Sequence, residues 1–454
     1  MDVKGLKRIY FIGIGGIGMS ALARFFNERG ATVKGYDKTE TELTKQLQAE
    51  GMDMHYIEDM ERIDATAELI IYTPAIPEDN KELKWYRDNN YPVYKRSDVL
   101  EWITASLYAI TVAGTHGKTT VSTMIAYLLR ETGYGCNAFL GGISVNYNSN
   151  YWSSEKDIAV IEADEYDRSF LKLHPDIAVL TAMDPDHLDI YGTVDAMEDA
   201  FIQHTHKIKP GGTLVVKQGI NRMNEFNAPT KITYTIQKDG ADVAAKNIVN
   251  KDGGYEFDVI GKGWEMKELA LRIGGIHNVE NAVAAITVTQ ILGIDKEEVK
   301  KALANFKGVK RRFEYKYKSD NVVYIDDYAH HPEELSALIQ SAKNMFTNRK
   351  CVIIFQPHLY SRTRDLAEGF AQSLDMADKI LLLDIYPARE LLMPGVTTEI
   401  ITAKMKNPNH MILSKQDVLA YVEKNPLELL ITAGAGNIDQ LVEPITDILE
   451  HKYE

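Results

Sequence analysis

The sequence predicts an α/β protein of roughly three domains, and three observations lead to this prediction. The chain has 454 residues, which is more than one hydrophobic core usually supports. Two glycine-rich loops each follow a strand-like run and open a helix-like run, as in α/β folds. Strand-like and helix-like runs alternate again from residue 322 onward, which predicts a further doubly wound domain.

The composition restricts the class of protein. Hydrophobic residues make up 45% and charged residues 26% of the chain, as in ordinary soluble globular proteins. A net charge of -14 argues against a nucleic-acid or acidic-membrane partner, because either needs a basic surface. Cys136 and Cys351 have no nearby cysteine, so they suggest neither a disulfide framework nor a zinc site and fit a reducing cytoplasm. No run reaches the roughly 18 apolar residues that a membrane span requires.

The first glycine-rich loop, residues 13–18, reads G-x-G-x-x-G. It follows the strand-like run 8–14 and precedes a helical pattern, which is the opening of a Rossmann-type unit. A second strand-like run, 32–36, ends at Asp37, whose carboxylate could accept a hydrogen bond from a ribose hydroxyl. By itself this pattern suggests NAD, and the alternative is that the glycines only allow close helix-on-strand packing. The rigid loop 73–77 follows a strand too, where doubly wound sheets bind ligands.

The second glycine-rich loop, residues 113–120, lies between a strand-like run (107–112) and an amphipathic run (121–130). Backbone N–H groups at the start of such a helix can hold phosphate oxygens, Lys118 adds a positive charge, and a threonine hydroxyl can join a Mg²⁺ shell. Val112 occupies the first glycine position of the G-x-x-x-x-G-K-[ST] pattern, so the match is incomplete. We expect a phosphate-binding loop, and an ordinary strand-to-helix turn is the alternative.

Acidic clusters follow the next two strand-like runs. Residues 162–167 follow the run 157–163, and residues 184–189, with His187 at their centre, follow the run 176–183. Isolated buried carboxylates are costly, whereas Mg²⁺ prefers oxygen ligands and bridges nucleotide phosphates. Beside a phosphate loop these clusters predict a metal site, although a solvated turn would explain each cluster taken alone.

Three later segments add candidates. Residues 274–281 open a helix, where Asn and His side chains could bind a base edge or cap the helix. The basic run 307–318 indicates a domain junction, and an arginine there could stabilise charge on a transferring phosphoryl group. Two adjacent histidines precede Pro332, and without an evident third ligand they favour substrate contact or helix-start structure over metal binding.

Eight motifs occur in an order that resembles the Mur ligase family over essentially the whole chain. They lie at residues 13–20, 114–120, 162–165, 186–189, 277–281, 311–314, 327–332 and 433–436. The resemblance implies a Rossmann-like domain for a UDP-sugar (1–106), a central P-loop ATPase-type mixed sheet with helices (107–313) and a C-terminal Rossmann-like doubly wound sheet that binds an amino acid (314–454). In this family the first glycine loop faces a uridine diphosphate instead of NAD.

Within the family, the motifs are similar to those of members that join L-alanine to the lactyl carboxylate of UDP-N-acetylmuramate. The resemblance implies a cytoplasmic step of peptidoglycan precursor synthesis, with ATP and Mg²⁺ as cofactors and an acyl phosphate as intermediate. We expect small-molecule substrates, no nucleic-acid or membrane partner, and a monomer or weak homodimer.

The resemblance also implies roles for individual residues. ATP would be bound by Gly114, Thr115, His116, Gly117, Lys118, Thr119, Thr120, His277, Asn278, Asn281 and Arg312. The UDP-sugar would be bound by Gly13, Gly15, Gly16, Ile17, Gly18, Ser20, Asp37, Thr73, Ala75 and Ile76, and the amino-acid side of the C-terminal domain would use Asp327, His330, His331 and Arg362. The catalytic set would be Lys118, Glu165, His187 and Arg312, and the metal ligands Thr119, Glu165 and His187, with Glu162 as an open alternative to Glu165.

One position departs from the family pattern, and three other functions remain open. Leu359 stands where an arginine is expected, so one basic contact to the amino acid or phosphate is left unassigned. A recycling ligase of the same family would attach a ready-made tripeptide to UDP-N-acetylmuramate. An NAD-dependent oxidoreductase would leave Lys118 and the acidic loops unused. A nucleotide-binding regulatory protein would bind ATP without amino-acid-dependent phosphate release.

Overall fold

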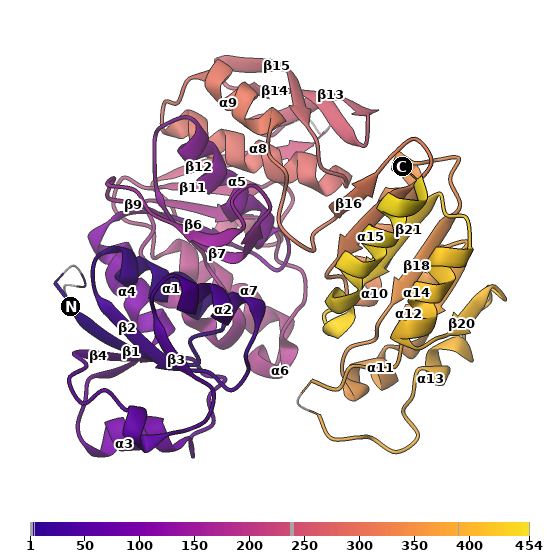
Figure 1. Ribbon diagram of the computed structural model, residues 1–454. Helices are drawn as coiled ribbons and strands as arrows, with labels where there is room; N and C mark the ends of the chain where they lie inside the picture. The colour runs from indigo at the N-terminus through magenta and orange to yellow at the C-terminus, as the bar shows by residue number, and fades with distance from the viewer. Residues whose placement is uncertain (1–2, 4, 237–239, 389, 454) are drawn as a thin grey trace. The chain divides into compact units, whose positions relative to one another are not determined.

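The computed structural model describes residues 3, 5–236, 240–388 and 390–453. Within these residues, three β-sheets alternate with helices along the chain (Figure 1), which confirms the predicted α/β class. The chain divides into two compact units, the first formed by Met1–Asn247, Phe257–Leu269 and Glu280–Phe306, the second by Ile248–Glu256, Ala270–Val279 and Lys307–Glu454. Among the described helices, none is long and apolar enough to cross a membrane.

The N-terminal sheet has five parallel strands in the order β3-β2-β1-β4-β5. Its strands are β1 (Arg8–Ile12), β2 (Thr32–Tyr36), β3 (Asp53–His55), β4 (Leu69–Tyr72) and β5 (Val93–Lys95), and its helices are α1 (Ile17–Glu28), α2 (Glu42–Ala49), α3 (Lys81–Asp88) and α4 (Arg96–Ser106), with the 3-10 turn η1 (Met60–Arg62). The central position of the first strand is the arrangement of a Rossmann-like unit and confirms that prediction.

The central sheet has ten strands in the order β15-β14-β13-β12-β11-β10-β6-β9-β7-β8. These are β6 (Tyr108–Ala113), β7 (Asn137–Ser144), β8 (Ser149–Trp152), β9 (Ile158–Glu162), β10 (Ile177–Leu180), β11 (Thr213–Lys217), β12 (Thr230–Ile236), β13 (Val243–Lys251), β14 (Gly254–Gly261) and β15 (Trp264–Leu271). Its helical elements are α5 (Lys118–Glu131), α6 (Leu188–Tyr191), α7 (Val194–Thr205), α8 (Ile276–Ile291) and α9 (Lys296–Ala304), with the 3-10 turns η2 (Tyr166–Lys172) and η3 (Met223–Glu225). Strands β9, β6 and β10 are parallel neighbours, while β8 is antiparallel to β7, so the sheet is mixed, as predicted.

The C-terminal sheet has six strands in the order β16-β17-β21-β18-β19-β20, all parallel except the edge strand β16. These are β16 (Glu314–Lys318), β17 (Val323–Asp327), β18 (Cys351–Phe355), β19 (Lys379–Leu382), β20 (His410–Ile412) and β21 (Leu429–Ala433). Its helices are α10 (Pro332–Met345), α11 (Tyr360–Asp365), α12 (Ala367–Leu374), α13 (Glu399–Thr402), α14 (Lys415–Lys424) and α15 (Val442–Tyr453), with the 3-10 turn η4 (Asn437–Leu441). Alternate residues of β18 belong to two different cores, Ile353 to that of α10 and α12 and Ile354 to that of α14 and α15. Helices therefore cover both faces, which confirms the doubly wound sheet.

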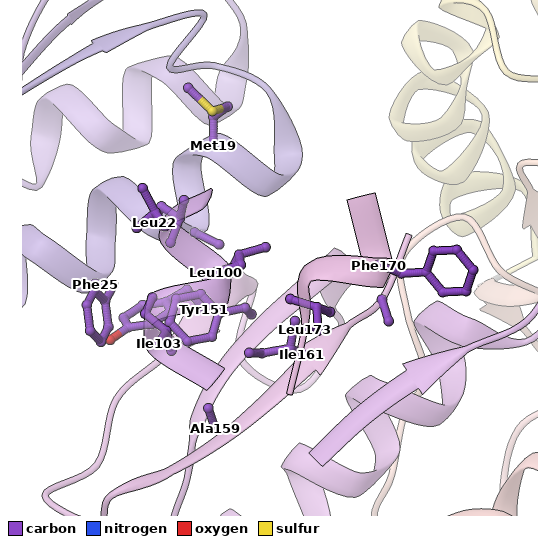
Figure 2. Packing of buried hydrophobic residues seen from close by; sticks show 14 of the residues in the cluster. Met19, Leu22, Phe25, Leu100, Ile103, Tyr151, Ala159, Ile161, Phe170 and Leu173 are labelled. Carbon is purple, nitrogen blue, oxygen red and sulfur yellow. The ribbon is translucent and has the colours of Figure 1, made fainter. Parts of the chain in front are cut away.

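Helix α1 joins the N-terminal sheet to the central sheet through a shared apolar core. Figure 2 shows side chains of this core, among them Leu22 and Phe25 of α1 and Tyr151 of β8. The ring of Phe25 lies 5.3 Å from that of Phe139 on β7. The two sheets are thus packed against each other within the first unit.

A buried polar clamp reinforces this packing. Asn150 of β8 donates hydrogen bonds to the carbonyl of Ile17 and to Oγ of Ser20, the latter at 2.9 Å, and its own carbonyl oxygen accepts from Arg24. Arg24 also forms an ion pair with Glu50 at 2.7 Å. Because buried amide groups are costly to leave unpaired, this clamp fixes the start of α1 on the central sheet.

Candidate active site

The loop between β6 and α5 has the conformation that a phosphate-binding loop requires. Gly114 and Gly117 have φ values of 137° and 82°, which favour glycine, and an added Cβ on Gly114 would collide with the Thr181 hydroxyl. The backbone N–H of Thr115 donates to the carbonyl of Ala182 at 3.2 Å, so the end of β10 supports the loop. Helix α5 then begins at Lys118, which directs its first backbone N–H groups toward the loop.

Lys118 and Glu165 form a buried ion pair beside this loop. Nζ of Lys118 donates to Oε1 of Glu165 and to the carbonyl of Gly114, both at 2.7 Å. Burial raises the pKa of Glu165, and the positive charge of Lys118 opposes that shift. The second carboxylate oxygen of Glu165 is buried and has no hydrogen-bond partner among the described residues. A buried anionic oxygen of this kind fits a cation ligand.

Glu162 approaches the same loop from the end of β9. Its Oε1 accepts a hydrogen bond from the Thr119 hydroxyl at 3.0 Å, and its Oε2 accepts from the backbone N–H of Gly141 at 3.0 Å. Burial raises the pKa of Glu162, against the opposing effects of Lys118 and Thr119. Thr119, expected to share a metal ion with Glu165, is therefore bonded to the alternative carboxylate Glu162.

A second group of side chains that could hold a metal ion lies around Glu165. Glu165, Asp186 and His187 each offer a ligand atom within 4.8 Å of the other two. His187 Nε2 lies 3.7 Å from Oε1 of Glu165, and His187 itself has the uncommon φ of 51° at the start of α6. Two carboxylates and an imidazole suit a divalent cation, so these residues fit the expected metal.

The residues expected at the adenine side are divided between the two compact units. In the first unit, the side-chain oxygen of Asn281 on α8 lies next to Gly117, 2.9 Å from where a Cβ would stand. In the second unit, Asn278 donates to the carbonyl of Gly274 at 2.6 Å, which ties down the start of α8 beside His277. The adenine contacts therefore stay a prediction.

The structure brings together most residues of the predicted UDP-sugar loop. Gly13 has a φ of 85°, and an added Cβ would meet the side chains of Thr73 and Ile76. The backbone N–H of Gly15 donates to Oδ2 of Asp37 at 2.7 Å, which joins the loop to the end of β2. Gly16 of this loop and Ala75 of the loop 73–77 are exposed. Ile17 and Gly18 are the first two residues of α1. Ser20 differs from its neighbours, because it is fully buried and its hydroxyl is bonded inside the protein.

In the C-terminal domain, Asp327 has a clear structural role. Its carboxylate accepts from the backbone N–H groups of Phe313 at 2.6 Å and Ala329 at 2.7 Å, so it joins the segment before β16 to the loop after β17. Arg312 lies beside this loop, with its guanidinium 5.4 Å from the ring centre of Tyr328. Burial raises the pKa of Asp327, and Arg312 opposes the shift.

A histidine and arginine cluster follows the same edge of that sheet. Arg362 contacts Nδ1 of His358 at 3.3 Å, and the ring of His358 lies 6.1 Å from that of His330. Burial, Arg362 and His330 together lower the pKa of His358 to about 4. His331 is instead the N-cap of α10, which supports the helix-start interpretation. Leu359, the departure from the family pattern, has the left-handed φ of 70°.

Three residues near these sites were not singled out from the sequence. Asp186 lies inside the motif 186–189, and His358 lies four residues before the predicted Arg362, so each had a signal in the sequence. Arg96, at the start of α4, lies against Gly18 and 3.9 Å from Asp164. No local pattern identifies Arg96, because its neighbours come from distant parts of the sequence.

Three models of one protein family match successive parts of the chain. Residues 8–108 match the model of the Mur ligase family catalytic domain, residues 112–289 the Mur ligase middle domain, and residues 311–436 the Mur ligase glutamate ligase domain. The chain belongs to the Mur ligase family. This membership replaces the interpretation as an NAD-dependent oxidoreductase.

Individual relatives are similar over their full lengths. The chain is 45% identical to a UDP-N-acetylmuramate–L-alanine ligase of Cytophaga hutchinsonii, covering 100% of this chain and 99% of the relative. It is 47% identical to the enzyme of that name from Porphyromonas gingivalis, covering 98% and 99%. The crystal structure of a UDP-N-acetylmuramate-alanine ligase from Thermotoga maritima aligns with a TM-score of 0.82 at 29% identity, covering 98% of this chain and 100% of that one.

Proposed function

We propose that this protein joins L-alanine to the lactyl carboxylate of UDP-N-acetylmuramate, with cleavage of ATP to ADP and phosphate, in the cytoplasmic synthesis of peptidoglycan precursors. The observation that carries the proposal is the position of Lys118. Its ammonium group lies at the start of α5, between the loop carbonyl of Gly114 and the buried carboxylate of Glu165. The names and full-length similarity of the relatives support the choice of substrates.

The reaction has two steps. A lactyl carboxylate oxygen attacks the γ-phosphorus of ATP, the bond to ADP breaks, and an acyl phosphate forms. The amine of L-alanine then attacks the acyl carbon, phosphate leaves, and the amine gives up one proton. Both reactants of the first step are anions, so positive charge at the loop lowers the barrier.

The chain's own residues have distinct parts in these steps. The backbone N–H groups after Gly117 and the ammonium group of Lys118 hold the ATP phosphates. Arg312 is assigned to the transferring phosphoryl group, and Asn278 and Asn281 to the adenine side. His330 and Arg362 are assigned to the amino acid, and their contacts through His358 support a preformed site in that domain.

Mg²⁺ is part of the proposal, and two sets of residues would hold it. Thr119 with Glu162 forms one set, and Glu165, Asp186 and His187 form the other. When bound, Mg²⁺ supplies positive charge that offsets the repulsion between carboxylate and phosphate. The unpartnered Oε2 of Glu165 supports this assignment.

The domain limits belong to the proposal as well. We assign residues 1–106 to the UDP-sugar, 107–313 to ATP and 314–454 to the amino acid, and we expect a monomer or weak homodimer without nucleic-acid or membrane partners. The order of the three family models along the chain supports this division.

The competing substrate is a ready-made tripeptide. A murein peptide ligase from Psychrobacter arcticus shares the fold, with a TM-score of 0.70 at 23% identity, covering 98% of this chain and 99% of that one. Phosphate release should therefore be measured with ATP, Mg²⁺ and UDP-N-acetylmuramate, adding L-alanine or the tripeptide in parallel. Phosphate release that requires L-alanine supports the proposal. Phosphate release that requires the tripeptide would identify the protein as a recycling ligase of the same family. If neither acceptor produced phosphate release, the interpretation as a nucleotide-binding regulatory protein would stand.

A further inference from the structure

A cavity of about 160 Å³ lies within the first unit, between helices α1 and α4 and the strands β7 and β9. Most of its wall is apolar and is formed by Ile17, Ala21, Leu100, Phe139, Leu140 and Ile161. Figure 2 shows two of these, Leu100 and Ile161, in the core that joins α4 to β9. The remaining lining includes the charged residues Arg96, Glu162 and Asp164. The cavity therefore offers both an apolar wall and charged groups.

Arg96 is the cation among the residues that line this cavity, and its guanidinium is poorly paired. Its side chain is 24% exposed, and among the described residues its recorded ion pair is with Asp164, at 3.9 Å. That separation is too long for a hydrogen bond, and the Asp164 side chain is itself 44% exposed. A methyl group on Gly18 would collide with Nη1 of Arg96, so the absence of a side chain there gives the guanidinium its place.

The cavity is linked to the phosphate loop through one of its lining residues, Glu162. Glu162 lines the cavity and accepts a hydrogen bond from the hydroxyl of Thr119, which follows Lys118 in that loop. A ligand in the cavity would therefore meet Arg96 while lying next to the residues assigned to ATP and Mg²⁺. A nucleophile that attacks the γ-phosphorus must occupy such a position.

We propose that Arg96 binds the lactyl carboxylate of UDP-N-acetylmuramate and that the cavity holds the lactyl group. This proposal rests on the proposed function. The carboxylate approaches a triphosphate past the acids Glu162 and Asp164, and a guanidinium offsets that repulsion while its planar fork fixes both carboxylate oxygens. The apolar wall suits the lactyl methyl group, so charge and shape select the same part of the substrate.

Binding of two sugar nucleotides tests this role. UDP-N-acetylglucosamine matches UDP-N-acetylmuramate except that a hydrogen replaces the lactyl group. Calorimetry with Arg96→Met should show roughly 10- to 100-fold weaker binding of UDP-N-acetylmuramate, the range expected for a lost charged hydrogen bond. Binding of UDP-N-acetylglucosamine should stay within about twofold, and Arg96→Lys should lie between wild type and Arg96→Met.

Lys172→Met is the matched control. Lys172, the last residue of η2, pairs with Asp98 of α4, the helix that also carries Arg96. Lys172 does not line the cavity. Loss of that pair should leave the affinities for both nucleotides unchanged. If Lys172→Met lowered both affinities, a disturbance of α4 would be enough to weaken binding. The proposed role of Arg96 would then be overturned.

Two other outcomes would also overturn the proposal. If Arg96→Met weakened the binding of both nucleotides equally, Arg96 would contact the diphosphate, which both nucleotides share. If the binding of both were unchanged, Arg96 would not belong to the site. The proposed function fails separately: wild-type protein that binds UDP-N-acetylmuramate but needs the tripeptide for phosphate release would leave the role of Arg96 intact.

Discussion

Nζ of Lys118 lies 2.7 Å from Oε1 of Glu165, beside the ends of the neighbouring parallel strands β6 and β9. The Glu165 side chain is fully buried and that of Lys118 is 14% exposed, so each charge depends on the other for solvation. A polyanionic substrate that binds Lys118 competes for this partner. Glu165 then needs another cation, and the nearby Asp186 and His187 offer the remaining ligands for one.

Replacement of Lys118 by alanine should abolish ligation. L-Alanine-dependent phosphate release should fall by at least roughly 100-fold, because the ATP phosphates lose the ammonium group that is assigned to them. Circular dichroism should show an unchanged fold, since Glu165 can take up a proton when its partner is removed.

Lys209→Ala is the control for this experiment. Lys209 pairs with Asp176 at 2.8 Å, next to the start of β10 and away from the phosphate loop. We expect that variant to keep its activity. Near-normal phosphate release by folded Lys118→Ala would contradict the proposed role of the loop.

Glu162→Gln and Glu165→Gln should each raise the Mg²⁺ concentration needed for half-maximal activity by at least roughly tenfold, because each removes an anionic oxygen ligand. The measurement is phosphate release over a Mg²⁺ titration, with activity lost on adding a chelator and restored by excess Mg²⁺. Glu198→Gln changes a buried carboxylate that pairs with Arg222 at 3.6 Å, outside the candidate active site, and should leave the titration unchanged. A shift in one active-site variant alone would assign the metal to that carboxylate.

Gly114→Ala should weaken ATP binding by at least roughly tenfold, because the new methyl group collides with Thr181 and Ala182 and displaces the loop. Gly133→Ala separates collision from backbone strain. Gly133 also has a positive φ, 71°, but no atom of the described residues lies within 4 Å of an added Cβ. That control should lose about 1 kcal/mol of stability and keep its affinity for ATP. Equal loss of affinity in both variants would show that the collision is unimportant.

His204 should make stability depend on pH. Burial lowers its pKa to about 4, so between that value and the ordinary 6.5 the unfolded chain binds more protons than the folded protein, and stability falls as the pH drops. From pH 7 to pH 5 the free energy of unfolding should decrease by about 2 kcal/mol through this residue. Urea midpoints should show this decrease in the wild type and in His206→Asn, which replaces an exposed histidine. His204→Asn should lack it, and an undiminished pH dependence in that variant would refute the assignment.

Much of the fold was predictable where local patterns and burial agree. The runs 157–163 and 176–183 predicted strands that appear as β9 and β10, because buried parallel strands are continuous apolar runs. No strand was predicted between residues 190 and 273, where the structure has β11 to β15. Apolar and charged residues alternate along parts of β14 and β15, which is the pattern of a half-buried strand, so the sequence carried a signal for these two strands that the search for continuous apolar runs missed.

The candidate site was predictable to the extent that its residues lie in contiguous motifs. Lys118 and Glu165 fall in loops after neighbouring strands, so the rule that strand ends meet at one sheet edge brings them together. Asn150 and Arg96 act through residues that are distant in sequence, and a single chain gives no signal for such contacts. Ser20 shows the reverse case, since its motif suggested a ligand contact while the structure bonds its hydroxyl to Asn150.

The clamp of Asn150 on α1 has a consequence for substrate choice. Because it fixes the start of α1 on the central sheet, the loops at residues 13–18 and 113–120 keep a constant separation. The first unit can therefore select substrates by their length. With the uridine diphosphate at residues 13–18, as proposed, a sugar nucleotide would place its carboxylate at the phosphate loop only if its length matched that separation, so substrates would be selected by length before any chemistry begins.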